Sequence, residues 1–385
     1  QIMPPIMGAA AFLMAEYMGV TYGQVTLWAI LPAVLYFGGI FISVHLEAKK
    51  LGLKGIPRSE LPRFKYLIRN VYLLLPLVFL IWMVTANIRS LQFSAAIAIL
   101  ISIAVSLVGT ICDATAEVRE TKTGSVAGIT AKKTGRMILD SLEAGGKGSI
   151  TVAVACAMAG MIAGCITVTG LASKLISGVI AISSAIPNPT LSLLLALFLT
   201  MLCCIVLGMG VPTTANYCIM ASTCAPILIT LGIPKVAAHF FVFYFGIVAD
   251  ITPPVALAAY AGSAIAKSDP MKTGINATKL AIAAFIIPYI FAYNNDLIFV
   301  GSDVNFLSVA SVVISATLGM ASIASGLMGY LIRDMKWISR IALVAGGLLM
   351  GIPGPVTDLA GLAVLVVVLV LQRIENKKDK AAASV

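Results

Sequence analysis

The chain has 385 residues, of which 60% are hydrophobic and 11% are charged, and its formal net charge is +10 at pH 7. So apolar a composition excludes an ordinary soluble domain, which needs a largely polar surface. The basic excess does not indicate a nucleic acid partner, because the lysines and arginines gather in a few loops between apolar runs.

Long apolar runs recur along the whole chain, and several are long enough to cross the hydrocarbon core of a bilayer, about 30 Å thick. In chain order they are Leu27–Leu46, Tyr72–Thr85, Phe93–Ile111, Ile150–Val168, Leu191–Leu207, Leu280–Ala292, Phe306–Ile332 and Leu359–Leu371. They are too long and too uniformly apolar for barrel strands, and a helix satisfies its own backbone inside lipid. The sequence therefore predicts an all-α polytopic membrane protein.

Basic loops alternate with loops that have almost no basic residue. Lysines and arginines cluster in residues 49–69, 119–147 and 373–380, whereas residues 294–305 carry Asp296 and Asp303 and no lysine or arginine. This alternation is the positive-inside pattern, which predicts that the three basic clusters face the cytoplasm. Within the second cluster, Ala131–Glu143 has the pattern of an amphipathic helix lying at the membrane surface.

The stretch GMGVPTTANY, residues Gly208–Tyr217, interrupts an apolar run with glycines, a proline and polar side chains. Backbone groups freed inside a membrane are tolerated only where they line a cavity or meet a ligand. Carbonyl groups of Leu207–Val211 could bind a cation at the end of a half-helix. The next half-helix would present the side chains of Thr213, Thr214 and Asn216 on its first turn. The alternative is a simple proline kink that binds nothing.

Two short apolar arms, KVAAHFFVFYFGIVAD and VALAAYAGSAIAKSDP, flank the sequence ITPP. Lys235 and Lys267 lie at their outer ends, so we expect a hairpin that enters and leaves the membrane on the cytoplasmic side. Its tip would be Thr252-Pro253-Pro254. Asp250 precedes this tip, and it is either a functional acid or a group that pairs with a lysine or caps the tip.

An internal repeat links the start of the chain to this hairpin. The opening MPPIMGAAAFLMAEYMGV and the later TPPVALAAYAGSAIAKSD both have a Pro-Pro pair followed by an arm of small residues. Each arm precedes an apolar helix with an internal proline, Pro32 in the first and Pro288 in the second. Charge places the first arm on the outer side and the second on the inner side. Two similar units of opposite orientation are an inverted repeat, typical of secondary transporters.

Four ordered motifs resemble the fused permease of tripartite ATP-independent periplasmic (TRAP) transporters, in the branch paired with TAXI-type binding proteins. They are PPIMGAAAFLMAE, HLEAKKLGLKG, GMGVPTTANY and AAHFFVFYFGIVADITPPVALAAYAGSAIA, and the resemblance covers residues 3–295. It implies an inverted-repeat, elevator-type importer with re-entrant hairpins and broken helices, in the inner membrane of a bacterium or archaeon. A TAXI-type periplasmic protein would deliver a small organic solute, with a carboxylate favoured. A sodium gradient would drive uptake, with no other cofactor.

Carried over by position, the resemblance implies two sodium sites and a substrate site. One sodium site would use Gly208, Met209, Gly210, Val211, Thr252 and Pro253, and the other would use Pro4, Pro5 and Gly8. Substrate would bind near Thr213, Thr214, Asn216 and Thr252, with Asp250 as a possible coupling acid. A first broken helix and another arm are expected before Pro4. We therefore expect that this chain, which opens with Gln1, is an N-terminally truncated piece of a larger protein.

Four segments are expected. Residues 1–46 would hold the second arm of the first hairpin and the next spanning helix, as part of a transport domain. Residues 47–148 would form a scaffold of basic loops, two spanning helices and the surface helix. Residues 149–295 would complete the transport domain with a spanning helix, the broken helix, the second hairpin and a further helix. Residues 296–385 would add C-terminal membrane helices and a basic tail.

Other functions stay open from the residues alone. Asp250 leaves room for proton coupling, and another ion-coupled transporter or a channel could share the same inverted-repeat architecture. An intramembrane aspartyl protease would need an acid in a Gly-x-Gly-Asp loop, but the loop at Gly208 reads GMGVP, and the apolar runs hold no second acid, serine–histidine pair or metal-ligand cluster. We therefore expect no enzyme. His45 and His239, which lie near helix ends, are expected to pack at a membrane interface.

Overall fold

The computed structural model describes residues 1–3, 7–61, 64, 68, 71–85, 91–121, 125–301, 304–352 and 354–382. Nearly all of this part is helical, and six of its helices are long and apolar enough to cross a membrane. The six are Tyr22–Lys50, Gln92–Arg119, Pro189–Gly208, Pro270–Tyr293, Phe306–Met328 and Pro355–Asn376. The prediction of an all-α polytopic membrane protein is confirmed.

The chain divides into two compact units. Unit 1 comprises Gln1–Gly19, Leu27–Lys54 and Met158–Val385, and unit 2 comprises Val20–Thr26 and Gly55–Ala157. Unit 2 includes most of the segment 47–148 that was expected to form a scaffold. That role stays a prediction.

Unit 2 is built mainly from long helices. It contains η1 (Arg58–Glu60), η2 (Val71–Leu74), α4 (Leu75–Thr85), α5 (Leu91–Thr121) and most of α6 (Val126–Thr169). An ion pair of 2.5 Å between Lys133 and Glu117 joins α6 to α5. The expected surface helix Ala131–Glu143 is not a separate element, because it continues into the apolar run that follows as one helix. No proline interrupts these residues, and the 44 residues of α6 rise about 66 Å.

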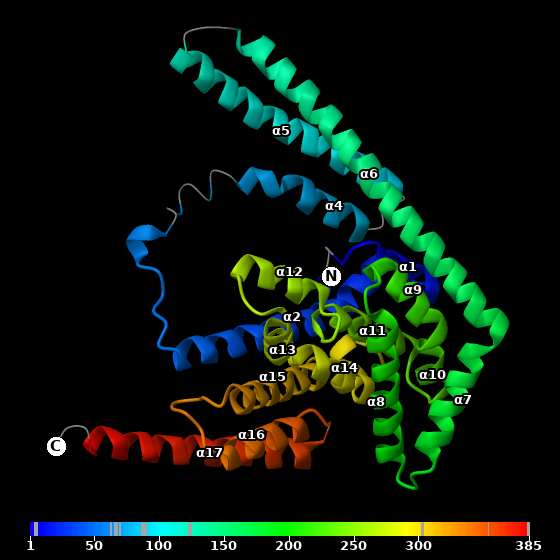
Figure 1. Cartoon of the computed structure of the whole chain (residues 1–385), viewed down its shortest axis with the longest axis vertical. Coiled ribbons are helices and arrows are strands. Elements are labelled where there is room, and N and C mark those ends of the chain that lie inside the picture. Colours follow the sequence, from blue (N-terminus) through cyan, green and yellow to red (C-terminus); the bar gives the residue numbers. More distant parts are fainter. Residues whose placement is uncertain are drawn as a thin grey trace. The chain divides into compact units, whose positions relative to one another are not determined.

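Helix α11 lies at the centre of unit 1, and its residues 237–246 are all buried. The elements of unit 1 are α1 (Ala9–Met18), most of α2 (Tyr22–Lys50), the end of α6, α7 (Leu171–Ser184), α8 (Pro189–Gly208), α9 (Thr213–Thr223), α10 (Ala225–Thr230), α11 (Lys235–Val248), η3 (Ala249–Ile251), α12 (Leu257–Ala266), α13 (Pro270–Leu280), α14 (Ala283–Tyr293), η4 (Asn295–Ile298), α15 (Phe306–Met328), α16 (Trp337–Leu349) and α17 (Pro355–Ala382). Helices α8, α9, α10 and α14 pack around α11 (Figure 1). The α11 sequence HFFVFYF is apolar on every side, as a helix with neighbours on every side requires.

The helices after residue 305 form a packed group of three, α15, α16 and α17 (Figure 1). Two glycines let α15 and α16 cross closely, since a Cβ on Gly347 would lie only 2.5 Å from the carbonyl oxygen of Gly319. Such contacts between small residues are typical of helix pairs in membranes. Leu46 of α2 packs against Ala324 and Met328, which attaches this group to the rest of unit 1.

The arms α1 and α12 have matching local geometry. Each has ten residues. Each is flanked by two residues of positive φ, Gly8 and Gly19 around α1 and Ala256 and Lys267 around α12. A three-residue connection then leads to α2 in one case and to α13 in the other. This correspondence agrees with a repeat, while the opposite orientation of its two copies stays a prediction.

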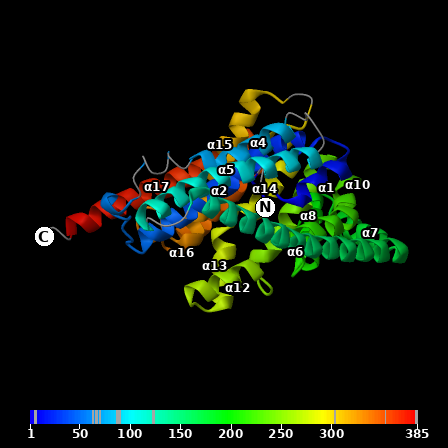
Figure 2. The same ribbon diagram turned by 90° about the horizontal axis from the view of Figure 1, so that it is seen from above.

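The second arm of the expected hairpin has an unexpected neighbour. Helix α12 packs against α13 and η3, and α12 and α13 lie side by side in both views (Figure 1, Figure 2). Gly274 of α13 permits this, because a Cβ there would lie 3.2 Å from Pro253 Cγ and 3.4 Å from Ala256 Cβ. The short connection after α12 thus folds this arm and the tip onto α13.

Candidate functional site

The helix break lies where the sequence predicts it. Helix α8 ends at Gly208, α9 begins at Thr213, and Met209–Pro212 connects them without helical structure. Gly210 has a φ of +74°, which side-chain-bearing residues rarely adopt. Pro212 caps α9, and its carbonyl oxygen accepts a hydrogen bond of 2.8 Å from the Asn216 amide.

The break leaves backbone oxygen atoms without donors. In the described part of the chain, the carbonyl oxygens of Met209, Gly210 and Val211 accept no hydrogen bond. The carbonyl oxygen of Gly208 accepts a long one, 3.4 Å, from the Val211 amide. Three adjacent acceptors are therefore available to a ligand that brings positive charge or hydrogen donors.

The tip after α11 is an irregular turn with its own hydrogen bonds. The Thr252 hydroxyl donates to the Val248 carbonyl oxygen at 2.7 Å, and the Tyr260 hydroxyl donates to the Pro254 carbonyl oxygen at 2.6 Å. The Pro253–Pro254 peptide bond is cis. Because the Thr252 hydroxyl is the donor in its contact with Val248, its oxygen lone pairs remain available to accept from, or bind, another group.

The break and the arm α11 approach each other through two glycines and one asparagine. The Asn216 Nδ2 donates a hydrogen bond of 2.7 Å to the Gly246 carbonyl oxygen. A Cβ on Gly208 would lie 2.9 Å from Asn216 Nδ2, and a Cβ on Gly246 would lie 2.9 Å from Asn216 Oδ1. Farther along, a Cβ on Gly210 would lie 4.0 Å from Val255 Cγ1, so the break also approaches the tip.

Asn216 is almost completely buried between the break and α11. Its side chain is 2% exposed, and its Oδ1 atom has no hydrogen-bond partner among the described residues. The neighbouring Thr213 and Thr214 are half-buried on the first turn of α9. The structure thus brings Gly208, Asn216 and Gly246 together, with the two threonines beside them in the chain.

Asp250 lies in a separate small cavity. This cavity has a volume of about 250 Å³, and Asp250 shares it with Tyr36 and Phe37 of α2 and Ala258 of α12. The carboxylate has no hydrogen-bond or ion-pair partner within the described residues. Neither Thr213 nor Thr214 lines this cavity.

The first tip is only partly described. Pro4 and Pro5 lie outside the described residues. Gly8 precedes α1 with a φ of +74° and is exposed. Because α1 packs against α9, the arm that follows the first tip contacts the half-helix that follows the break.

A buried tyrosine–histidine pair beside the break was missed by the sequence reasoning. The Tyr217 hydroxyl and His239 Nδ1 share a hydrogen bond of 2.8 Å, and both side chains are buried. His239 thus packs inside the protein, while His45 is exposed and its ring stacks on Phe41; the interfacial depth expected for both stays a prediction. The sequence did hold a signal for this pair. Tyr217 and His239 each carry a polar group within an apolar segment, and buried polar groups need partners.

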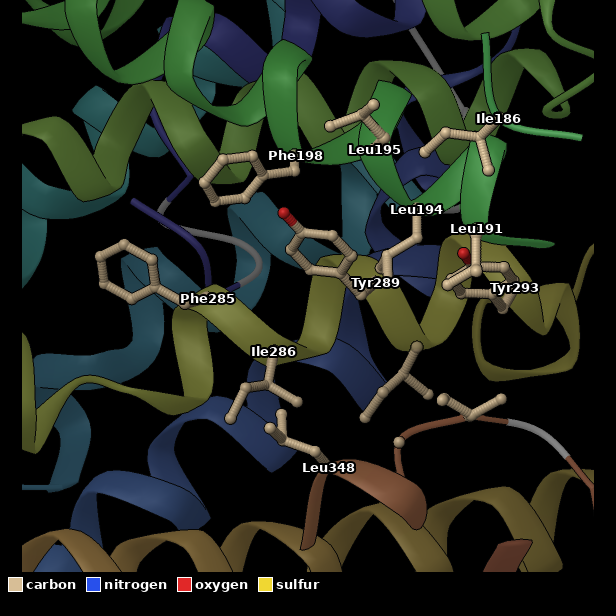
Figure 3. A pocket seen from close by; sticks show the side chains of 13 residues that line it. Ile186, Leu191, Leu194, Leu195, Phe198, Phe285, Ile286, Tyr289, Tyr293 and Leu348 are labelled. Atoms are coloured by element: carbon tan, nitrogen blue, oxygen red, sulfur yellow. The ribbon is translucent and has the colours of Figure 1, made fainter. Parts of the chain in front are cut away.

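A large apolar cavity lies away from the break. It has a volume of about 550 Å³, and apolar side chains of α8 and α14 line it together with Leu348 and its neighbours (Figure 3). The hydroxyl of Tyr289 at its wall contacts the sulfur of Met201 at 3.3 Å. So apolar a cavity lacks the polar groups that would orient a small polar solute.

The fold and these sites define a multi-pass membrane protein in which an unwound helix segment contacts the buried helix α11 and approaches the proline turn that follows it. Residues 1–306 match the family described as Tripartite ATP-independent periplasmic transporter, DctM component, and the chain belongs to this family. Its members are transporter permeases that work with a periplasmic solute-binding protein and with the DctQ component. Searches among curated proteins and among solved structures returned no significant match.

Proposed function

We propose that this protein is the permease of a sodium-driven importer, and that a TAXI-type periplasmic protein delivers its cargo, a small organic acid. Helices α1, α2 and α8–α14 would form a transport domain that moves past a scaffold in unit 2. We infer the ion, the cargo, the delivering protein and the movement from the resemblance of the motifs to those of TRAP permeases.

The single observation that carries the proposal is the set of donor-free oxygen atoms at the break. The carbonyl oxygens of Met209, Gly210 and Val211 and the buried Oδ1 of Asn216 all lack hydrogen donors among the described residues. Unwound carbonyl groups inside transporters are the usual ligands of sodium. The residues present therefore fit a sodium ion, which would supply the missing positive charge.

The first turn of α9 supports an anionic cargo. The first amide groups of a helix have no partner within it, and they carry a partial positive charge. The side chains of Thr213 and Thr214 lie on the same turn and can donate hydrogen bonds. A carboxylate placed there would be stabilised without an arginine.

Transport into sealed vesicles tests this function. The purified protein would be reconstituted together with the cognate binding protein and offered a panel of radiolabelled carboxylates. We expect accumulation above the external concentration under an inward sodium gradient, and none when potassium replaces sodium. Equilibration without accumulation would indicate a channel.

Proton coupling is the second candidate, and the cavity of Asp250 favours it. Asp250 is half-buried, and its carboxylate has no hydrogen-bond or ion-pair partner among the described residues. Such a carboxylate can take up and release a proton. Accumulation driven by a pH gradient in sodium-free buffer would support this candidate over the first.

A further inference from the structure

One face of α16 has an open groove that no described helix fills. We call it the α16 groove; it has a volume of about 270 Å³, and Trp337, Arg340, Ile341, Val344, Ala345 and Leu348 line most of it. Leu348 also lines the large apolar cavity next to α8 and α14, where Figure 3 shows its side chain below Ile286. Leu348 therefore borders both the α16 groove and that cavity.

The end of the groove at Trp337, where α16 begins, carries a fixed positive charge. Arg340 donates hydrogen bonds of 2.9 Å to the carbonyl oxygens of Gly326 and Leu327, from Nε and Nη2. Its Cζ atom lies 4.8 Å from the centre of the Trp337 ring. Within the described residues, Nη1 donates no hydrogen bond and no carboxylate pairs with this guanidinium. Arg340 is therefore held rigidly with donors to spare.

Further basic groups lie near the C-terminal end of α15 and the N-terminal end of α16, beside Arg340. Lys50 donates to the Met328 carbonyl oxygen at 2.8 Å, and Lys336 is largely exposed. Glu375 lies 3.5 Å from Lys336 and 3.7 Å from Arg333, so one carboxylate is shared by two cations. Lys50, Arg333, Lys336 and Arg340 outnumber the acids Asp334 and Glu375 at this end, so positive charge is in excess there.

The placement of this end matches an anionic lipid surface. Lys50 belongs to the first basic cluster of the sequence, which the positive-inside pattern places at the cytoplasmic face. The cytoplasmic leaflet is the one rich in anionic lipids. The 13 residues of α16 rise about 20 Å, so a chain lying along the groove from this face would extend through one leaflet.

We propose that the α16 groove binds one anionic phospholipid. Its phosphate lies against Arg340 and Lys336, and an acyl chain lies along Val344 and Ala345 toward Leu348. Charge complementarity selects this occupant. An apolar partner helix would leave the spare donors of Arg340 unused, and a zwitterionic lipid would bring a second cation, its choline group, beside Lys336.

Native mass spectrometry of the purified full chain, equilibrated with equal amounts of phosphatidylglycerol and phosphatidylcholine, tests the proposal. The unchanged protein is expected to retain one phosphatidylglycerol molecule in preference to phosphatidylcholine. Lys336→Gln is expected to lower this preference about fivefold, because one cation near the lipid surface is lost. Arg340 is left unchanged, since it also caps α15.

A second variant tests the groove itself. Ala345→Phe fills it and is expected to abolish retention, whereas Ile338→Phe is the matched control, because Ile338 is 82% exposed and does not line the groove. Equal retention of the two lipids by the unchanged protein would overturn the proposal. So would retention unaffected by Ala345→Phe, or a mass that shows a second copy of the chain in place of lipid.

Discussion

The side chain of Asn216 is hydrogen-bonded to the backbone of Gly246, with 2.7 Å between Nδ2 and the carbonyl oxygen. This bond fixes the half-helix α9 to the central helix α11. Gly208 lies against the same amide group, so the end of α8 belongs to the same contact. The break is therefore held open by a buried polar contact between three helices.

A double-mutant cycle measures that contact. Asn216→Ala leaves the buried Gly246 carbonyl without its donor, and we expect a loss of about 1–3 kcal/mol. Gly246→Ala destabilises the protein by pushing a methyl group against Asn216 Oδ1. The double variant should lose less than the sum, with a coupling of about 0.5–3 kcal/mol. Thermal unfolding in one detergent gives all three values, and simple additivity would show that the two residues are independent.

Gly210→Leu tests the backbone of the break. The φ of +74° strains any side-chain-bearing residue by about 1–2 kcal/mol, and leucine would also crowd Val255. We expect the variant to fold and insert but to lose sodium-dependent uptake. Gly178→Leu in α7 is the control, because no heavy atom lies within 4 Å of a Cβ there. Normal uptake by Gly210→Leu would remove the ion site from the break.

Thr252→Val keeps the side-chain size and removes the oxygen that contacts the Val248 carbonyl. If that oxygen also binds the ion or the cargo, half-saturation should rise about tenfold to a hundredfold, and Thr252→Ser should restore it. Uptake is measured against sodium and cargo concentration and normalised to folded protein. Lower thermal stability with unchanged half-saturating concentrations of sodium and cargo would show that Thr252 only caps the end of α11.

Asp250→Asn distinguishes sodium coupling from proton coupling. Under sodium coupling, the variant should retain uptake driven by a sodium gradient, because the oxygen atoms of the break are intact. Under proton coupling, uptake driven by a pH gradient should disappear. The exposed acid Glu16, changed to Gln, serves as the control and should leave both rates unchanged.

Cysteine probes test the orientation in the membrane, in a background freed of the seven native cysteines. Probes at Lys54 and Ser125 should react only with reagent on the cytoplasmic side, and a probe at Ser302 only from outside. Labelling of position 54 from outside would invert the map, and the α16 groove would then face the other leaflet.

The break and the tip could be predicted because proline and glycine act locally. Gly210 and Pro212 together end one helix and start another, and the adjacent Pro253 and Pro254 open the turn, whereas a single proline such as Pro32 stays inside a helix. The apolar runs likewise predicted the helices, since lipid allows few alternatives. These features depend on residues adjacent in the chain.

Contacts between distant segments could not be predicted in this way. The pair Tyr217–His239 and the packing of α12 on α13 depend on which helix faces come together. The continuity of α6 was missed because a change from polar to apolar sequence resembles an element boundary, although no residue there stops a helix. The cavity that Asp250 shares with Tyr36 and Phe37 likewise depends on how η3 leaves α11, and the role of Asp250 as a coupling acid stays a prediction.

The contacts of α2 with α15 join two parts of the chain that the family match separates. Leu46 and Lys50 lie inside the matched residues 1–306, whereas Ala324 and Met328 lie beyond them. A chain cut after residue 306 would present this face of α2, with its lysine, directly to lipid. Among relatives that keep both parts, position 46 should therefore vary together with positions 324 and 328, whereas position 50, which bonds to a backbone carbonyl, needs only a donor.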